Sequence, residues 1–430
     1  MTIQTVISHE KETTLQLLNA LFLTENLEGI RVRLWDDSIW PEYGEANTML
    51  VLNHPGALRA MLLPGTELGM AEAYLYNDID IEGNIEAIFD LAGDLTHAVG
   101  SLRKKIKILG LLRQLPVPPP RPMIRRGPVR LNGKQHSIER DHQAVIYHYD
   151  ISNDFYNLWL DPDMVYSCGY FLNAEDTIEK AQSEKLDYIC RKLRLRPGQR
   201  LLDIGCGWGG LVICAAVNYG VDATGITLSQ PQADYANRRI TEMGLSDRCR
   251  VLVQDYREVP ETELYDTLVS VGMFEHVGRT LLKQYFEKAY RLLKPYGVFL
   301  NHGISITQTH QQAGPDPFSD RYVFPDGELI PIQETLTTAE QVGFETRDVE
   351  SLREHYILTL RQWVDRLERN HEHAMRFVDE HTFRVWRLYM SGSIHGFKTR
   401  RLNIYQSLFV KPGDRGDIRL PLTRIDWYKN

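Results

Sequence analysis

The chain has 430 residues, of which 25% are charged, and a formal net charge of −8 at pH 7. This length allows two or three domains with cores of their own, and the negative charge argues against a general nucleic-acid-binding protein. Five cysteines without a short regular spacing disfavour a disulfide framework and a metal site, and the absence of an apolar run of about 18 residues argues against a membrane span.

Residues 1–115 are expected to form a small α+β domain. Helical periodicity covers residues 13–23, 55–63 and 69–75, and alternating apolar residues predict strands at 30–35 and 48–52. No motif in this part carries chemistry. The Pro-rich segment 115–122 cannot hold a helix, so we predict an interdomain linker over residues 116–135.

A basic tract without Asp or Glu extends over residues 95–138. Its cations alternate with leucine and isoleucine, which suits the surface of a membrane that contains anionic lipid. A solvated linker is the alternative interpretation, because a connector can be basic for solubility alone. The cations considered are Arg103, Lys104, Lys105, Lys107, Arg113, Arg121, Arg125, Arg126 and Arg130.

From residue 136 onward, helices and strands are predicted to alternate as in a doubly wound α/β sheet. The expected strands are residues 200–204, 222–226, 250–254, 267–272 and 297–301. Ligands of such sheets bind at the carboxyl ends of the strands. Two later helical stretches, 355–369 and 372–390, are expected to roof a substrate pocket.

The most informative motif is Leu-Leu-Asp-Ile-Gly-Cys-Gly-Trp-Gly-Gly at residues 201–210, where a buried strand runs into a glycine-rich turn. Glycine allows close approach of a ligand to the backbone. Gly210 also completes the spacing of a dinucleotide site, but Thr227 and Leu228 stand where the acid of such a site is expected. Asp203 better fits the acidic strand end of S-adenosylmethionine-dependent methyltransferases. A glycine turn without a ligand is the alternative.

Further motifs stand at residues 148–156, 166–171, 272–278 and 301–304 and around Tyr356. Together with the glycine motif they resemble the cyclopropane fatty acid synthase family, including the mycolic acid cyclopropane synthases, over about residues 136–410. The N-terminal part resembles that of longer bacterial members, most of all a subgroup that makes mid-chain methylene- or methyl-branched acyl chains. The resemblance implies a Rossmann-like class I methyltransferase fold with helical lid insertions over residues 136–430.

The chemistry implied by the resemblance is methyl transfer from S-adenosylmethionine to the cis double bond of an unsaturated phospholipid acyl chain. The resulting carbocation loses a proton to a bound bicarbonate, and a cyclopropane ring forms. The implied catalytic residues are Cys168, Glu275, His302, the backbone of Ile304, and Tyr356. Each has a structural alternative, such as a small buried hydrophobe for Cys168 or a core residue for Tyr356. His276 is expected to be structural.

The cofactor contacts implied by the same matching lie in four segments of the chain. The hydroxyl of Thr227 and the amide of Gln232 replace the usual acid as hydrogen-bonding partners of the ribose and the methionyl tail. Several relatives carry a cysteine where this chain has Ser393, so a covalent cysteine mechanism is not expected. The implied contacts are Tyr166, Ser167, Asp203, Gly205, Gly207, Thr227, Leu228, Gln232, Asp255 and Tyr256.

Several alternatives remain open on sequence alone. Loss of a different proton after a hydride shift would give a methylene-branched chain, which a partner reductase would saturate. A methyltransferase for small amines and a non-catalytic lipid-binding scaffold are the other readings. Acidic residues near the start of the chain argue against both a signal peptide and a transit peptide. They are Glu10, Glu12, Glu25 and Glu28. We expect a cytoplasmic protein that associates peripherally with membranes, with a homodimer as a further expectation.

Overall fold

The computed structural model describes residues 3–22, 29–91, 102–121, 124, 126–149, 151–262, 264–309 and 317–428. Arg125 of the basic tract and Asp150 of the motif that begins at His148 lie outside the described residues. The chain divides into two compact units. The first contains Met1–Pro128 and Asp379–His395, and the second contains Val129–Val378 and Gly396–Asn430.

The first unit is an α+β arrangement around a four-stranded sheet in the order β2-β1-β3-β4. β1 and β3 pair parallel, whereas the other neighbours pair antiparallel. The strands are β1 (Gly29–Arg33), β2 (Ile39–Trp40), β3 (Ala46–Leu52) and β4 (Ile79–Gly83). The helices are α1 (Ile3–Leu21), α2 (Ala57–Leu62), α3 (Glu67–Leu75), α5 (Leu102–Gln114) and α16 (Glu380–Lys398) as far as His395.

Helix α16 belongs to the first unit for most of its length, although the sequence places it with residues 136–430. Two buried arginines of α16 explain this grouping. Arg384 donates hydrogen bonds to the carbonyl oxygens of Tyr74 and Ile79, and Arg387 donates to that of Ile81. Because buried guanidinium groups require such acceptors, these contacts tie α16 to α3 and β4.

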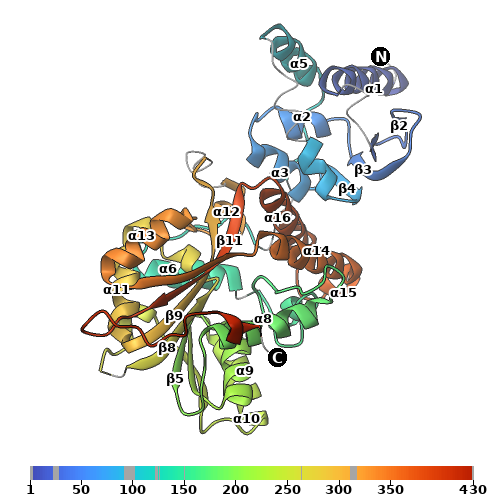
Figure 1. Cartoon of the computed structure of the whole chain (residues 1–430). Helices are drawn as coiled ribbons and strands as arrows, with labels where there is room; N and C mark the ends of the chain where they lie inside the picture. Colours follow the sequence, from blue (N-terminus) through green and yellow to red (C-terminus); the bar gives the residue numbers. More distant parts are fainter. Residues whose placement is uncertain are drawn as a thin grey trace. The chain divides into compact units, whose positions relative to one another are not determined.

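The second unit is built on a seven-stranded sheet in the order β10-β11-β9-β8-β5-β6-β7 (Figure 1). The five strands from β7 to β9 are parallel to their neighbours, while β11 runs antiparallel to β9 and to β10. The sheet is therefore mixed. Its strands are β5 (Arg200–Ile204), β6 (Asp222–Thr227), β7 (Cys249–Val253), β8 (Tyr265–Val271), β9 (Leu293–Ile306), β10 (Glu345–Ser351) and β11 (Leu402–Val410).

Both faces of this sheet are buried under helices, as the α/β prediction requires. Alternate residues along a strand enter opposite cores: Leu201 packs with residues of α8, α9 and α10, and Leu202 packs with residues of α11 and α13. The helices are α6 (Ile138–Tyr149), α7 (Asn153–Asn157), α8 (Ile178–Lys192), α9 (Gly210–Tyr219), α10 (Gln230–Glu242), α11 (Leu282–Leu292), α12 (Pro317–Tyr322), α13 (Ile332–Val342), α14 (Arg353–Arg369) and α15 (His371–Ala374). Short 3₁₀ helices are η2 (Tyr256–Glu258), η3 (Phe274–His276), η4 (Arg279–Leu281) and η6 (Ile425–Trp427).

Candidate active site

The glycine motif forms the turn between β5 and α9. Gly205, Gly207 and Gly209 all have positive φ, at 83°, 54° and 83°, so each occupies a conformation that other residues adopt at a cost. A Cβ at Gly205 would lie 2.6 Å from the Cβ of Met273. A Cβ at Gly207 would meet no protein atom within 4 Å, so the space beside Gly207 is open.

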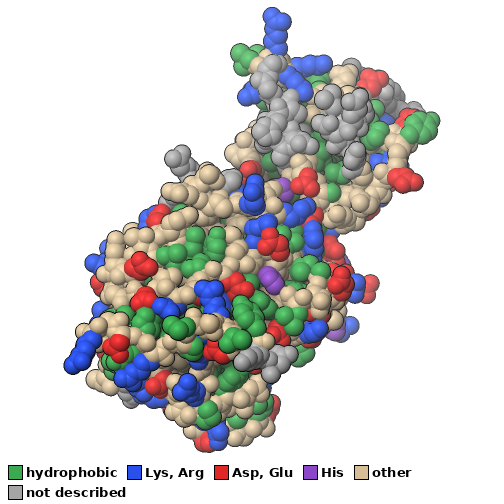
Figure 2. Space-filling model, in the orientation of Figure 1, with side chains coloured by type: hydrophobic (Ala, Val, Ile, Leu, Met, Phe, Trp, Pro, Cys, Tyr) green, Lys and Arg blue, Asp and Glu red, His purple; other side chains and the backbone are tan. Residues whose placement is uncertain are grey.

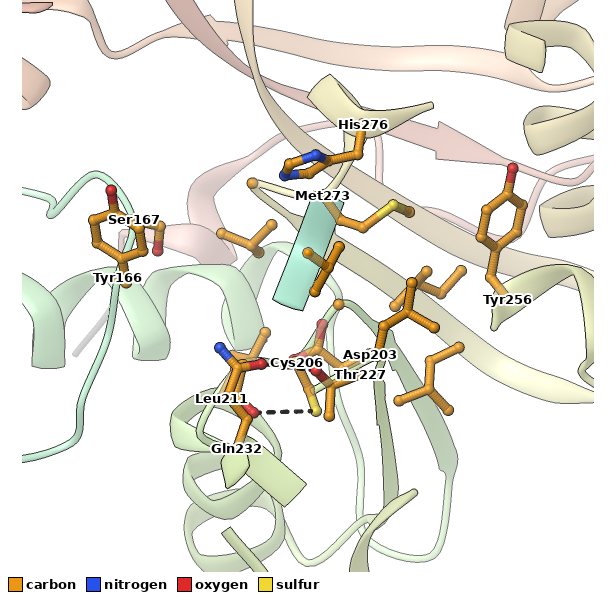
Figure 3. A pocket seen from close by; sticks show the side chains of 18 of the residues that line it. Tyr166, Ser167, Asp203, Cys206, Leu211, Thr227, Gln232, Tyr256, Met273 and His276 are labelled. Atoms are coloured by element: carbon orange, nitrogen blue, oxygen red, sulfur yellow. Dashed lines mark hydrogen bonds between the residues drawn. The ribbon is translucent and has the colours of Figure 1, made fainter. Parts of the chain in front are cut away.

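One pocket lies at the carboxyl ends of β5, β6 and β8, and all ten residues that the resemblance implies for the cofactor line it. In Figure 3, Tyr166 and Ser167 lie at one side and Tyr256 at the other, with Asp203, Cys206 and Thr227 between them. The structure thus brings together segments that are far apart in the chain. Their role as cofactor contacts stays a prediction.

Thr227 and Gln232 form a preset polar pair on the pocket wall. The Thr227 hydroxyl donates to the Gln232 side-chain oxygen at 2.7 Å, a bond that is dashed in Figure 3. Ser229 fixes the start of α10 by accepting from the backbone N–H of Gln232. Since the amide oxygen of Gln232 is occupied, its NH₂ group remains a donor for a ligand.

Asp255 already has a charge partner. Arg257 binds both of its carboxylate oxygens, with Nε donating to Oδ1 at 2.8 Å and Nη2 to Oδ2 at 2.6 Å. Arg257 also donates to Asp141 at the start of α6. The charges of Asp255 and Arg257 are therefore satisfied within the protein, and this end of the pocket is suited to a ligand part without charge.

Asp203 lies in a different situation at the end of β5. It is buried, and its Oδ1 atom has no hydrogen-bond partner. Burial raises the pKa of its carboxyl from 3.8 to about 7, and the nearby Lys185 ammonium partly opposes this shift. A buried acceptor without a partner beside the open space at Gly207 suits a ligand that carries a positively charged donor.

Sequence reasoning missed several residues of the pocket, and one of them is His276, which it expected to be structural. His276 lies in η3 and lines the pocket, and its role there stays a prediction. Burial, with His136 as a second cause, lowers the pKa of His276 to about 4, so the imidazole is neutral at neutral pH. A helical spacing would have turned His276 away, but the short η3 does not extend into a longer helix. Other residues missed are Asp141, Tyr149, Lys185, Trp208, Gly272 and Met273.

A second group of residues surrounds the end of β9 and does not line this pocket. Glu275 Oε1 accepts from the backbone N–H of Ile304 at 2.6 Å, while Glu275 Oε2 and His302 Nε2 are buried without a hydrogen-bond partner. Burial raises the pKa of Glu275 to about 7 and lowers that of His302 well below its usual value. His302 Nδ1 lies 3.3 Å from the side-chain nitrogen of Gln406 on β11.

Cys168 and Tyr356 are joined to this group through the backbone of Leu352. The Cys168 thiol lies 3.8 Å from the Leu352 carbonyl oxygen, which also accepts from the N–H of Tyr356 at 3.1 Å. Leu352 in turn donates to the carbonyl of Ile404, and Ile404 pairs with Ile304 between β11 and β9. Hydrogen bonds and strand pairing thus link the segments that carry all five implied catalytic residues, and their catalytic role stays a prediction.

The donor set of this region fits a small oxyanion such as bicarbonate. If the Gln406 NH₂ donates to His302 Nδ1, then His302 Nε2 carries the ring proton and is a free donor. The N–H of Ile304 is already bound to Glu275, so an anion that uses it must displace the carboxylate. Burial raises the pKa of the Cys168 thiol strongly, which makes it a poor nucleophile.

Within the described ranges, no group of three or more His, Cys, Asp or Glu side chains is placed to hold a metal ion. Likewise, none of the described helices combines the length and apolar character that a membrane crossing needs.

Comparison with known proteins identifies relatives along most of the chain. The family model for mycolic acid cyclopropane synthetase matches residues 136–407. A probable fatty acid methyltransferase of Pseudomonas putida is 36% identical over 403 residues, covering 93% of this chain and 96% of that protein. The cyclopropane-fatty-acyl-phospholipid synthase of Escherichia coli K12 is 37% identical over 269 residues, 63% of this chain and 68% of that protein.

A solved structure agrees with these relatives. The mycolic acid cyclopropane synthase in complex with SAH and CTAB is 33% identical with a TM-score of 0.60, over 63% of this chain and 98% of that one. The class I methyltransferase fold expected from the sequence is confirmed. The chain belongs to the mycolic acid cyclopropane synthetase family and is an S-adenosylmethionine-dependent methyltransferase of the cyclopropane-fatty-acyl-phospholipid synthase type.

Proposed function

We propose that the protein binds S-adenosylmethionine in the pocket described above and methylates the cis double bond of an unsaturated phospholipid acyl chain to form a cyclopropane ring. The observation that carries this proposal is the pocket at the glycine turn, with open space at Gly207 and a buried acceptor on Asp203, next to the Glu275 region. When bound, the cofactor supplies a methyl group on a positively charged sulfur.

The protein must contribute to the reaction in three ways. The pocket must align the methyl group with the double bond, because an isolated alkene is a weak nucleophile and positioning is the largest available term. The surroundings must exclude water, since a carbocation forms on the acyl chain once the new carbon–carbon bond is made. A base must then remove a proton, and the ring closes with the electron pair of that C–H bond.

The Glu275 region would hold the base. A bicarbonate ion bound there would accept the proton, and His302 Nε2, the Ile304 N–H and Tyr356 are the groups that would hold it. Glu275 lies against the Ile304 N–H and has a pKa raised to about 7 by burial. Its carboxyl is therefore partly protonated near neutral pH and can share a proton with an oxyanion.

A second candidate product is the methylene-branched chain. It is favoured by the relative that aligns over 93% of this chain, because that protein bears the name of a fatty acid methyltransferase. The two products have the same mass, so mass alone does not separate them. The test is NMR of the product from purified protein, S-adenosylmethionine and a defined oleoyl phospholipid: ring-proton signals support the cyclopropane, and vinylidene signals support the methylene product.

Two further outcomes of this experiment test the hypotheses of a non-catalytic scaffold and of an amine methyltransferase. A protein that binds the cofactor but never releases S-adenosylhomocysteine with any unsaturated phospholipid would be a scaffold. Release that requires a small amine would indicate an amine methyltransferase. If a methylene product forms, a reductase that saturates it is the expected partner.

We further propose that helix α5 attaches the protein to anionic membranes. Its inner face is buried through Ile108, Leu111 and Leu112, whereas Leu102 and Ile106 are 72% and 62% exposed. Arg103, Lys105, Lys107 and Arg113 are exposed on the same helix. Lys and Arg side chains lie beside apolar ones where Figure 1 places α5 (Figure 2). This combination is typical of helices that lie in the headgroup layer.

The membrane proposal is tested by reversing two charges, Lys105→Glu with Lys107→Glu. Each cation near an anionic surface contributes roughly 1 kcal/mol, so binding to vesicles with phosphatidylglycerol should weaken at least about tenfold. Activity on detergent-dispersed substrate should stay unchanged. A matched control reverses Arg248 and Lys283, two exposed cations of the second unit. Equal vesicle binding by wild type and the α5 variant would refute the docking role.

A further inference from the structure

Lys185 on α8 is a buried cation at one end of the cofactor pocket. Its side chain is only 1% exposed, and its Nζ atom donates to the Ser167 hydroxyl oxygen at 2.7 Å. Among the described residues, Lys185 forms no ion pair with a carboxylate. A buried ammonium without a carboxylate partner is costly, so a protein that keeps one at a pocket wall has a reason for it.

The acidic groups near Lys185 are either engaged elsewhere or set apart from it. The carboxylate of Asp161 accepts hydrogen bonds from the backbone N–H groups of Asp163 and Val165, each at 2.9 Å. Asp203 lines the same pocket, and the positive charge of Lys185 partly opposes the rise in its pKa. The Asp203 Oδ1 atom has no hydrogen-bond partner, and within the described residues the two side chains form no ion pair. One end of the pocket therefore presents an ammonium and a carboxylate that are not paired with each other.

The other charged groups of the pocket are already satisfied. Arg257 is paired with Asp255 and Asp141, and His276 is neutral near pH 7. The unpaired charges thus gather at the end with Lys185, Ser167 and Asp203. Such a pair of separated opposite charges is complementary to a zwitterion, whose carboxylate meets the ammonium and whose amino group meets the carboxylate.

We propose that Lys185 binds the α-carboxylate of S-adenosylmethionine and that Ser167, which accepts a hydrogen bond from Lys185, donates its own hydroxyl proton to the same carboxylate. Asp203 then accepts from the α-ammonium group of the cofactor. This assignment rests on the proposed binding of the cofactor in this pocket. It makes Lys185 a cofactor-binding residue that selects for the amino-acid end of the ligand.

Cofactor binding should then be linked to a proton. Burial lowers the pKa of the free Lys185 ammonium to about 8. A bound carboxylate favours the charged form, so it raises this pKa again. Above about pH 8, the protein should take up a proton when it binds a ligand with the carboxylate, and its affinity for that ligand should fall as the pH rises through the pKa of the free lysine.

The test compares two ligands and two variants by calorimetry. S-adenosylhomocysteine carries the carboxylate, whereas S-adenosyl-3-thiopropylamine keeps the amine and lacks it. Lys185→Met should weaken the first ligand about ten- to a hundredfold, as expected for a charge-assisted hydrogen bond, and leave the second nearly unchanged. The control is Lys192→Met, which removes a buried lysine of the same helix that is paired with Glu350 and Asp348 outside the pocket.

Each outcome decides something. If Lys185→Met weakens both ligands equally, the preference for S-adenosylhomocysteine over the amine is unchanged. This result would overturn the assignment of Lys185, but it would not contradict the binding of the cofactor in this pocket. If wild type binds neither ligand, the proposed cofactor site itself fails. If Lys185→Met does not fold, proton uptake by wild type at pH 8.5 decides instead. Uptake with S-adenosylhomocysteine but not with the amine supports the role of Lys185, and equal uptake with both overturns it.

Discussion

Two glycines of the turn after β5 should respond to the same substitution in different ways. Gly205→Ala places a Cβ 2.6 Å from the Cβ of Met273, an atom that cannot rotate away, at a residue with φ of 83°. The left-handed conformation costs roughly 1–2 kcal/mol for alanine. Overpacking adds about 1–3 kcal/mol. We therefore expect Gly205→Ala to lower the free energy of unfolding by about 2–5 kcal/mol.

Gly207→Ala should instead act on the ligand. Its φ is 54°, and its Cβ would meet no protein atom within 4 Å. Only the conformational cost of roughly 1–2 kcal/mol applies to the free protein. Because Gly207 lines the pocket, the added methyl group should collide with a bound cofactor. A cost of about 1–3 kcal/mol corresponds to a loss of affinity of roughly five- to 150-fold.

The assay combines urea unfolding without ligand and calorimetric titration with S-adenosylhomocysteine. Comparing the unfolding midpoints at equal m values gives the stability difference between the two variants. Gly205→Ala should be the less stable, and Gly207→Ala should lose affinity beyond what its stability explains. Wild-type affinity in Gly207→Ala would refute the placement of the cofactor against this glycine.

Three other predictions concern single side chains. Glu275→Gln should keep cofactor affinity within about twofold and lower turnover, measured as S-adenosylhomocysteine release, by about a hundredfold. The reason is that general base catalysis contributes about 10²–10⁴ to the rate. A loss of cofactor affinity as large as the loss of turnover would contradict the position of Glu275 outside the pocket. The raised pKa of Asp203 means that the native state holds a proton which the unfolded chain has lost, so stability should fall as pH rises from about 4 to about 7. Asp203→Asn should flatten this part of the urea-midpoint profile, and an unchanged slope would count against the pKa. Ser393→Ala should retain activity within about twofold, since its hydroxyl donates to the Tyr389 carbonyl within α16 and no covalent step uses it; a large loss in the release assay would reopen a covalent mechanism.

The sequence predicted the parallel part of the sheet well because these strands are short, mostly buried segments rich in apolar residues that alternate with helices. The predicted strand at residues 200–204 coincides with β5, and those of β6, β7 and β8 match to within two residues at each end, but β9 (Leu293–Ile306) extends well beyond both ends of the predicted 297–301. β10 and β11 were missed. β10 reads Glu-Thr-Arg-Asp-Val-Glu-Ser, a polar pattern that is stable as an edge strand only because β11 supplies its hydrogen bonds.

The pocket wall was predictable where the chain follows the strand ends, and not where it depends on helix packing. Thr227 and Asp255 come directly after the predicted strands 222–226 and 250–254, so their place at the sheet edge follows from topology. Lys185 lies in the middle of α8, 15 residues before β5, and no strand end points to it. The available signal was that Lys185 falls on the apolar face of its helix. Because lysine is seldom fully buried in a protein, a lysine on such a face indicates a special role.

The arginines of α16 have a consequence for any attempt to shorten this enzyme. A chain that starts at residue 136 would keep Arg384 and Arg387 but lose the carbonyl oxygens of Tyr74, Ile79 and Ile81 that accept from them. The guanidinium groups of Arg384 and Arg387 would then lack these acceptors, and the apolar side chains of α16 that pack in the first unit would become exposed. The amino-terminal segment is thus no detachable accessory, because the chain leaves this unit at Pro128 and returns at Asp379 to complete it.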